Sequence, residues 1–289
     1  MKKAFIGGLL ILLALSAHAE KITVGLYDPV LSARMSKKDY VLGMNVFVKE
    51  LIRSEKIEGE TISYDDPIKL ADDFESGKIN MIACDALTIV DNIPFSYLQN
   101  GIMGYKNNKT DNQTLLLISN TEDTRPFPEK LRGSITTNGD TTAELYVKTL
   151  MLQNGLSESV NWIVTKNPQQ SILKLFFKKA DLALVDRGSF MIAAELNPQL
   201  KSKLTILKSI PLTVGAVSFM RKGMSPILHQ QVLALGKEMN STPRGKQLLQ
   251  LFRGTYMDES SPKELENVYA LKKQYETLHK NTLKQTQGK

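Results

Sequence analysis

Hydroxyl and amide side chains gather just before one predicted helix, in the run Thr136, Thr137, Asn138, Gly139, Asp140, Thr141 and Thr142. A helix N-terminus carries unpaired N–H groups and a partial positive charge, and hydroxyls add donors without adding charge. Gly139 allows the backbone to approach a ligand closely. The turn therefore predicts contact with an anionic group of a small ligand. The alternative is that Asp140 or Thr141 only caps the helix.

Two aspartates end predicted strands, and an arginine follows the second of them. Asp85 closes the apolar run that starts at Ile79, and Asp186-Arg187 closes a similar run. Because ligands of open α/β sheets bind outside the carboxyl ends of the strands, these side chains are candidate ligand contacts. The acids suit an amine or hydroxyls, and Arg187 suits a carboxylate or phosphonate. Alternatively, each aspartate caps the next helix, and Arg187 pairs with Asp186 or lies on the surface.

Signals of enzymatic chemistry are missing from the sequence. The three histidines, His18, His229 and His279, are far apart, and no His/Cys cluster has the spacing of metal ligands. The sequence contains no G-x-S-x-G, P-loop or H-E-x-x-H motif. We therefore predict a protein that is not an enzyme and that uses no cofactor and no metal. Tyr27, after the first predicted strand, is a further candidate to stack on or hydrogen-bond a ligand.

The elements that carry these residues alternate between strand and helix. In the first part of the chain the expected order is a strand at Lys21–Leu26, a helix from Ser36, a strand at Thr61–Tyr64, a helix capped by Asp66 and a strand at Ile79–Ala83. Pro67 stands at the first position of the second helix, where proline is favoured. This order predicts a parallel sheet with crossover helices.

The same order is repeated further along the chain. The expected elements are a strand at Ser134–Thr137, a helix at about Thr141–Gln153, a strand at Val160–Val164, a helix capped by Asn167 and a strand at Ala180–Val185. A single offset of 101 residues relates Asp66 to Asn167 and Asp85 to Asp186. We interpret the repeat as two related α/β lobes. The alternative is that capping and turn residues common to βαβ units recur at this spacing by chance.

Two strand-like segments connect the predicted lobes. Residues 114–119 precede the second lobe and residues 214–220 follow it, so the chain crosses between the lobes twice. We predict a discontinuous first lobe (20–115 with 215–289) and an inserted second lobe (116–214). Ser261, Pro262 and Glu264 form a capping box at the start of a final helix. We expect this helix to pack on the outside of the first lobe; the alternative is a helix that binds a partner.

The first residues have the features of an export signal. Lys2 and Lys3 precede the apolar run Phe5–Leu15, and Ala17-His18-Ala19 is a small-x-small cleavage site. We predict a signal peptide over 1–19; the alternative, a membrane anchor, needs about 20 apolar residues. No cysteine follows the run, so we predict no lipid anchor. Removing residues 1–19 takes away two lysines and no acid, which lowers the net charge from +7 to +5.

The charge distribution and the cysteine content further limit the kinds of partner and of stabilisation that we expect. Basic residues are interspersed with acids instead of forming a stripe with aromatics, so we predict no nucleic-acid partner. Cys84 is the only cysteine, so the chain has no internal disulfide and depends on an ordinary core. Cys84 lies in an apolar run and is expected to be a small buried side chain; the alternative is a reactive thiol.

Several segments together resemble a known family. They are KITVGLYD, SGKINMIACDAL, LRGSITTNGDTTAEL, KKADLALVDRGSF and TVGAVSFMRKG, in that order after the export signal. Their order and spacing resemble the type II periplasmic binding proteins, especially the phosphate/phosphonate-type substrate-binding components of ABC transporters. The resemblance covers nearly all of residues 20–255. It implies two lobes around a ligand cleft and transfer of the ligand to a membrane permease, although some relatives act as sensors.

The resemblance also implies where the ligand lies. By analogy with the family, the contacts would come from Tyr27 and Asp28, from Asp85 and Ala86, from the turn at 136–142 as the anion cradle, and from Asp186 and Arg187. Phosphonate binders favour a serine-rich turn without an acid, whereas this chain has Asp140. An acid facing the cleft would repel a dianion, which puts phosphate or phosphonate specificity in doubt. We therefore expect a small polar ligand that is anionic or zwitterionic.

The functional prediction follows from the residues and the resemblance together. We predict a monomeric periplasmic solute-binding protein that captures a small molecule for an ABC importer and whose protein partner is the inner-membrane permease. The alternative is a periplasmic sensor that signals through a different partner.

Overall fold

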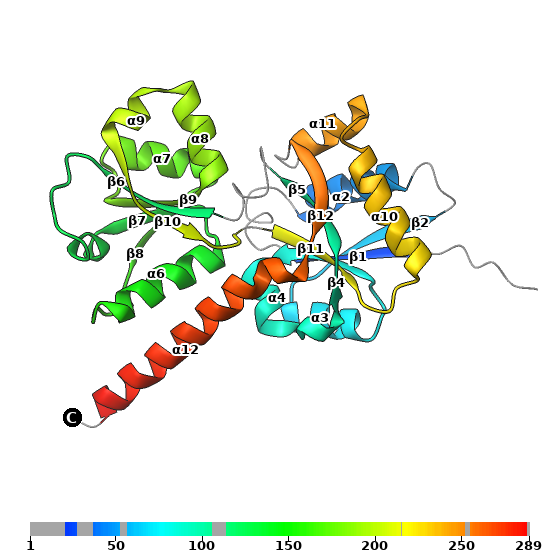
Figure 1. Ribbon diagram of the computed structural model, residues 1–289, viewed down its shortest axis with the longest axis horizontal. Helices are drawn as coiled ribbons and strands as arrows, with labels where there is room; N and C mark the ends of the chain where they lie inside the picture. Colours follow the sequence, from blue (N-terminus) through cyan, green and yellow to red (C-terminus); the bar gives the residue numbers. More distant parts are fainter. Residues whose placement is uncertain are drawn as a thin grey trace, which may run out of the picture.

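Two five-stranded sheets organise the molecule and lie side by side (Figure 1). The computed structural model describes residues 21–27, 37–52, 57–105, 114–214, 216–251 and 255–287. The predicted signal peptide and Asp28 lie outside these residues.

The first sheet has the strand order β2-β1-β3-β11-β4. Its strands are β1 (Lys21–Tyr27), β2 (Glu58–Ser63), β3 (Met81–Asp85), β4 (Leu98–Gln99) and β11 (Ala216–Arg221). β1 pairs in parallel with β2 and β3, as the strand–helix alternation predicted, whereas β11 runs antiparallel to β3. A separate pair, β5 (Gly101–Tyr105) and β12 (Tyr256–Ser260), is antiparallel.

The second sheet has the order β10-β6-β9-β7-β8. Its strands are β6 (Thr114–Asn120), β7 (Ser134–Thr137), β8 (Asn161–Val164), β9 (Leu182–Asp186) and β10 (Leu204–Pro211). β7 pairs in parallel with β8 and β9, and β6 runs antiparallel to β9. Both sheets thus have a parallel centre with one antiparallel neighbour. The predicted fold class, two α/β lobes of mostly parallel strands, is confirmed.

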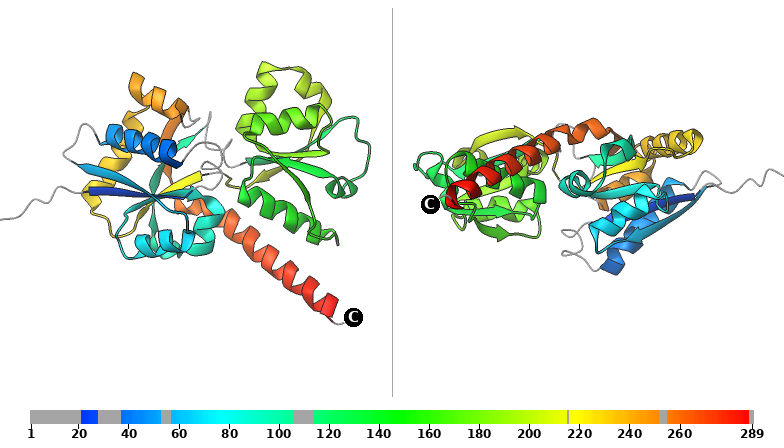
Figure 2. Two further views of the ribbon diagram at one scale, coloured as in Figure 1. Left: turned by 180° about the vertical axis from the view of Figure 1, so that it is seen from behind. Right: turned by 90° about the horizontal axis from the view of Figure 1, so that it is seen from below.

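Helices cover both faces of each sheet (Figures 1 and 2). Around the first sheet are α2 (Lys37–Leu51), α3 (Pro67–Glu75), α4 (Ala86–Asn92), α10 (Pro226–Glu238) and α11 (Pro243–Leu251), and around the second are α6 (Thr141–Gln153), α7 (Pro168–Phe176), α8 (Arg187–Leu196) and α9 (Gln199–Lys203). Three 3-10 turns lie between other elements of the described chain: η1 (Phe95–Tyr97), η2 (Glu129–Arg132) and η3 (Pro262–Leu265). The helix α12 (Glu266–Gln287) follows η3.

Alternating side chains on the strands make the two faces of each sheet apolar. On β9, Leu182 and Leu184 belong to one buried cluster, while Ala183 and Val185 belong to another on the opposite face. This period of two, with both faces buried, is typical of a sheet between two helical layers. Cys84 is fully buried and forms no disulfide, in agreement with the small buried side chain that the sequence predicted.

The 101-residue repeat is present in the structure residue for residue. α3 and α7 have bounds exactly 101 residues apart, and so do β3 and β9. Asp66 and Asn167 both cap a helix whose first residue is proline: Asp66 accepts from the Ile68 N–H and Asn167 from the Gln170 N–H, at 2.9 Å each. The local chemistry that set these elements in the first lobe therefore sets them again in the second.

The position of the C-terminal helix corrects a prediction. The capping box at Ser261 and Glu264 is formed, but it opens the turn η3, and α12 follows. α12 does not pack on the first lobe alone: it leaves η3 beside α4 and runs along α6 of the second lobe (Figures 1 and 2). Its apolar stripe, which includes Val268 and Leu271, belongs to a buried cluster with residues of both α4 and α6.

Candidate functional site

Asp85 joins the two lobes at the carboxyl end of β3. It caps α4, with Oδ1 accepting from the Thr88 N–H at 2.9 Å and Oδ2 accepting from the Thr88 hydroxyl at 2.5 Å. A third donor comes from the other lobe: the Thr141 hydroxyl donates to Asp85 Oδ1 at 2.8 Å. The side chain is only 7% exposed. The structure thus brings two predicted ligand contacts together, in a hydrogen bond with each other.

Asp186 holds the matching position in the second lobe. It caps α8, accepting from the Ser189 N–H at 2.8 Å and from the Ser189 hydroxyl at 2.7 Å. Asp186 is half-buried, and Arg187, the first residue of α8, is exposed. The capping alternative is therefore correct for both aspartates as local structure, and it leaves Asp186 partly accessible.

The turn before α6 is held by its own side chains. Asp140 is the N-cap of α6: it accepts from the Ala143 N–H at 2.8 Å and is 8% exposed. Thr137 Oγ1 accepts from the Gly139 N–H at 3.3 Å, and Gly139 has a φ of +81°, a value that glycine adopts without strain. The Asp140 carboxylate thus offsets part of the positive charge at the start of α6.

The threonines of this region differ in what their hydroxyls bind. Thr136 donates to the Ile163 carbonyl at 3.1 Å and so ties β7 to β8. Thr142 is fully buried, and its hydroxyl has no hydrogen-bond partner in the structure. Burying a hydroxyl without a partner costs about 1–3 kcal/mol. Asn138, in the same turn, is half-buried.

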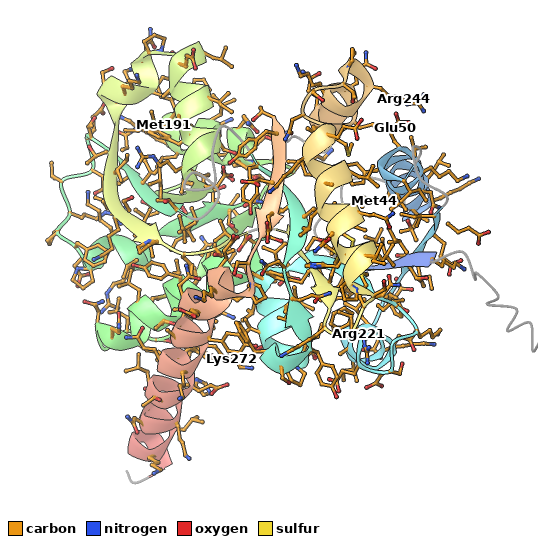
Figure 3. The ribbon with its side chains drawn as sticks, turned by 45° about the vertical axis from the view of Figure 1, so that its right-hand side comes forward. Met44, Glu50, Met191, Arg221, Arg244 and Lys272 are labelled. Atoms are coloured by element: carbon orange, nitrogen blue, oxygen red, sulfur yellow. The ribbon has the colours of Figure 1, made fainter. Side chains whose placement is uncertain are left out.

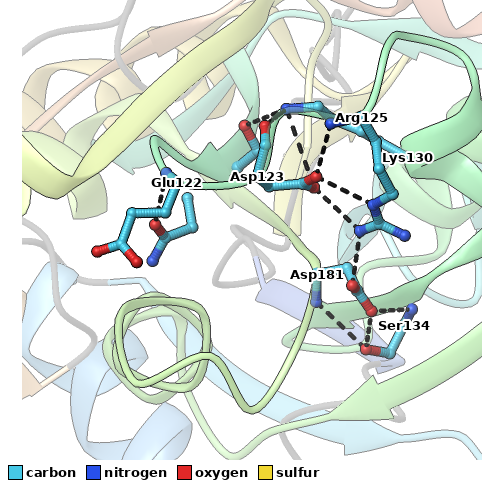
Figure 4. A network of polar contacts seen from close by, with 8 residues as sticks. Glu122, Asp123, Arg125, Lys130, Ser134 and Asp181 are labelled. Atoms are coloured by element: carbon cyan, nitrogen blue, oxygen red, sulfur yellow. Dashed lines mark hydrogen bonds and ion pairs between the residues drawn. The ribbon is translucent and has the colours of Figure 1, made fainter.

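A polar network fixes the start of β7, which leads into the turn (Figure 4). The Asp181 carboxylate accepts from the Ser134 N–H (2.8 Å), the Ser134 hydroxyl (2.7 Å) and Arg125 (2.6 Å). Arg125 also donates to Asp123, and buried Lys130 donates to the Asp123 carbonyl at 2.5 Å. Burial alone would raise the pKa of Asp181, but the hydrogen bonds from Ser134 and Arg125 outweigh it and lower the pKa.

Tyr27 lies in the same neighbourhood as Asp85, because β1 and β3 are parallel neighbours with Tyr27 opposite Cys84. The tyrosine is half-buried. Burial raises its pKa, and the negative charge of Asp85 raises it further. A neutral phenol at this position can donate a hydrogen bond.

The candidate residues therefore fall into two groups at the ends of parallel strands, and Thr141 belongs to both. One group joins Tyr27 and Asp85 to Thr141 of the other lobe. The second lies at one edge of the second sheet, where β7 and β9 end side by side and carry the turn at 136–142 and Asp186 with Arg187. Sequence reasoning missed Thr88 and Ser189, although their position three residues after each capping aspartate was a usable signal.

Two structural findings limit the other classes of site. In the described part of the chain, no cluster of three or more His, Cys, Asp or Glu side chains could hold a metal ion. Among the same residues, no helix is both long enough and apolar enough to cross a membrane.

Comparison with known proteins decides the family. A sequence model described as "ABC transporter, phosphonate, periplasmic substrate-binding protein" matches residues 100–265, more than half of the chain. The chain belongs to this family. The resemblance inferred from the sequence segments is thereby confirmed. No curated protein sequence matches.

Solved structures of the phosphonate-binding family and others share the fold of this substrate-binding protein. XAC2383 from Xanthomonas citri, bound to ATP, is similar with a TM-score of 0.60 and 13% identity over 91% of this chain and 99% of the other. PhnD1 from Prochlorococcus marinus, in complex with methylphosphonate, has a TM-score of 0.57 and 14% identity over 87% and 97%. A phosphonate-transporter binding protein from Pseudomonas aeruginosa has a TM-score of 0.53 and 12% identity over 93% and 100%.

Membership gives this substrate-binding protein its general setting. The family consists of binding proteins of ABC transporters, which implies a small-molecule ligand, a permease partner and a periplasmic location. The ligand itself, the residues that bind it, cleavage after Ala19 and the monomeric state stay predictions.

Proposed function

We propose that this protein captures a small polar ligand, anionic or zwitterionic, between its two lobes and delivers it to an ABC importer. In this proposal the lobes are residues 20–115 with 215–289 and residues 116–214. The mature chain starts at Glu20, is a monomer and carries no lipid anchor.

The buried hydroxyl of Thr142 carries the proposal. It stands at the start of α6, next to Thr141, whose hydroxyl reaches Asp85 of the other lobe. Buried polar groups without a partner are rare in native structures. A ligand oxygen that accepts a hydrogen bond at the start of α6 would satisfy this donor. The same ligand would lie where the two lobes already touch.

The charges around the turn favour a ligand with both an acidic group and a donor. The Asp140 carboxylate already accepts from the Ala143 N–H, one of the N–H groups that an anion at this helix start would use. The anionic group is therefore better matched to Arg187, whose guanidinium binds a carboxylate or phosphonate through two hydrogen bonds. Asp85 and Asp186 accept hydrogen bonds and would take an amine or hydroxyls of the ligand. A compact dianion without a donor would be repelled by these two carboxylates.

Binding would compete with an existing contact between the lobes. In the structure the Thr141 hydroxyl donates to Asp85. A ligand oxygen that accepts from this hydroxyl would free Asp85 to accept from the ligand's own amine or hydroxyl. A zwitterion would thus replace one hydrogen bond between the lobes with two hydrogen bonds through the ligand.

A thermal-shift screen tests the proposal. The probes are methylphosphonate, 2-aminoethylphosphonate, inorganic phosphate, amino acids and neutral polyols, each added to the mature chain. A ligand at 100 times its dissociation constant adds about 2.7 kcal/mol to the free energy of unfolding. For a protein of this size the midpoint should rise by a few degrees.

We expect the zwitterionic probes to give the largest rise and the neutral polyols to give none. The Arg187→Ala variant, screened in parallel, should lose the rise while keeping the unliganded midpoint. A rise with polyols alone, or with no probe at all, would contradict the proposal.

A further inference from the structure

The final helix is attached to the chain segment that crosses between the lobes. Just before α12, the Glu264 carbonyl accepts from the Thr213 hydroxyl at 2.6 Å. One turn later, the Asn267 side chain donates to the Pro211 carbonyl at 3.1 Å. Residues 211–213 lead from β10 of the second sheet to β11 of the first. The start of α12 thus holds one of the two crossings in place.

The first two turns of α12 are attached to the first lobe. The Lys272 ammonium lies 2.7 Å from Asp91 Oδ1 on α4 (Lys272 is labelled in Figure 3). The Tyr269 hydroxyl donates to the Ile93 carbonyl at 3.4 Å, and its ring meets Phe95 edge to face with centroids 5.9 Å apart. These contacts all involve α4 or the turn that follows it.

Further along, α12 is attached to the second lobe through Glu158, in the loop between α6 and β8. The Tyr275 hydroxyl donates to Glu158 Oε2 at 2.7 Å, and His279 Nδ1 donates to Oε1 at 2.6 Å. Tyr275 and His279 are one turn apart and stack with ring centroids 5.4 Å apart. Burial, followed by the hydrogen bond to Glu158, raises the pKa of Tyr275 to about 12. We call these three residues the Glu158 clasp.

Apolar packing runs along the same path. Leu265, Val268 and Leu271 are buried in one cluster with side chains of α4, such as Ile89, and of α6, such as Val147. A rotation of one lobe away from the other would strip α12 from α4 or from α6 and expose this stripe to water. A helix packed on both lobes therefore opposes the rotation that two crossing segments alone would permit.

We propose that α12 is an interlobe brace, which holds the second lobe in a narrow range of orientations through the Glu158 clasp. The inference goes beyond the proposed function, because it concerns what limits lobe movement and does not depend on the identity of the ligand. A merely stabilising helix would change the free energy of unfolding when loosened but would leave the distance between the lobes unchanged.

Spin labels on the two lobes measure this distance directly. Asp72 on α3 and Gln169 on α7 are exposed, so Asp72→Cys and Gln169→Cys place one label on each lobe. Cys84→Ala removes the remaining thiol. Pulsed dipolar spectroscopy then gives the distance distribution for the labelled parent and for variants of the clasp, in the mature chain without ligand.

Two variants open the clasp from opposite sides. Glu158→Ala removes the acceptor, and Tyr275→Phe with His279→Gln removes both donors. The matched control is Thr277→Ala on the exposed side of α12, because the Thr277 hydroxyl donates only within its own helix, to the Lys273 carbonyl. Circular dichroism confirms that each variant is folded.

The brace predicts a single narrow distribution for the parent and the control, and a distribution at least twofold broader for both clasp variants. A folded clasp variant with the narrow distribution of the parent overturns the proposal. A broad distribution in the parent itself overturns it as well, since the lobes would then move freely with the clasp intact.

Discussion

Asp85 and Asp186 hold equivalent positions in the two lobes, and their surroundings differ. Each ends a strand and caps the next helix, and each accepts from the N–H and the hydroxyl of the residue three positions later. Asp85 is buried, bonded to Thr141 and followed by the fully buried Ala86. Asp186 is half-buried and followed by the exposed Arg187.

The same helix-capping arrangement therefore occurs in two different surroundings. The capping chemistry depends only on the aspartate and the residue three positions later, so it is the same in both lobes. The surroundings of each carboxylate depend on the next residue and on the opposite lobe. In the first lobe the Asp85 carboxylate contributes to contact between the lobes. In the second lobe the Asp186 carboxylate stays partly accessible beside the cationic Arg187. On this reasoning the lobes contribute unequally to ligand binding.

The largest expected difference between the two aspartates is in stability. Asp85→Ala removes a cap and leaves the half-buried donors of Thr88 and Thr141 without this acceptor, which should cost about 2 kcal/mol. Asp186→Ala removes a cap at a more accessible position and should cost about 1 kcal/mol. Urea unfolding of both variants measures the two losses. Equal losses would mean that the contact with Thr141 contributes nothing.

Two threonines in α6 allow a test of whether the second lobe donates a hydrogen bond to the ligand. Thr142→Val replaces a buried, unpartnered hydroxyl with a methyl group, so the free energy of unfolding should rise by about 1 kcal/mol. Ligand affinity should fall about tenfold, since the ligand loses one donor.

Thr149→Val is the matched control for that change. Thr149 is also buried in α6, but its hydroxyl donates to the Leu145 carbonyl at 2.8 Å. The control should leave affinity unchanged and should not raise stability. If Thr142→Val binds the ligand as tightly as the parent protein, the buried hydroxyl has no part in binding.

The smallest expected effect is on how the free energy of unfolding changes at acidic pH. Asn80 and Asp181 are 101 residues apart, and each binds the backbone at the start of a central strand: Asn80 at Lys21 and Thr23, Asp181 at Ser134. The pKa of Asp181 is lowered in the folded protein. Its contribution is therefore present above the unfolded-state pKa of about 3.9 and is lost as pH falls through the folded-state pKa. Asn80 adds no such dependence.

Asp181→Asn makes the second lobe resemble the first at this position. As the pH is lowered from about 5 to about 3, the free energy of unfolding of this variant should decrease less than that of the parent. Urea unfolding at several pH values measures the two decreases. The partly exposed carboxylate makes this a small change. Parallel pH profiles for the two proteins would contradict the assigned role of Asp181.

Local signals in the sequence predicted most of the fold. The caps at Asp66 and Asn167, the prolines that follow them and the apolar periodicity placed α3, α7, β7 and α6 within a residue or two of their observed bounds. These elements are set by side chains within a few residues of their own backbone. For the same reason, the sequence predicted that Asp140 or Thr141 caps α6, and Asp140 does.

Contacts between distant segments could not be predicted from the sequence. The apolar stripe of α12 gives the face that is buried but not the surface that covers it, so its packing on both lobes was missed. Likewise, both Asp85 and Thr141 were candidate ligand contacts, yet nothing in the spacing predicted that they bond to each other across the lobes. Such pairings depend on how the lobes are oriented.

The most direct test of ligand binding by Asp186 and Arg187 of the second lobe is calorimetric titration. The probe that gives the largest thermal shift is titrated into the parent protein, Arg187→Ala and Asp186→Asn. The control is Arg132→Ala, an exposed arginine paired with Glu129 outside the candidate site. Our account predicts at least tenfold weaker binding for both site variants, about 1.4 kcal/mol, with unchanged unliganded midpoints and parental affinity for the control. Parental affinity in both site variants would contradict the account and place the ligand elsewhere.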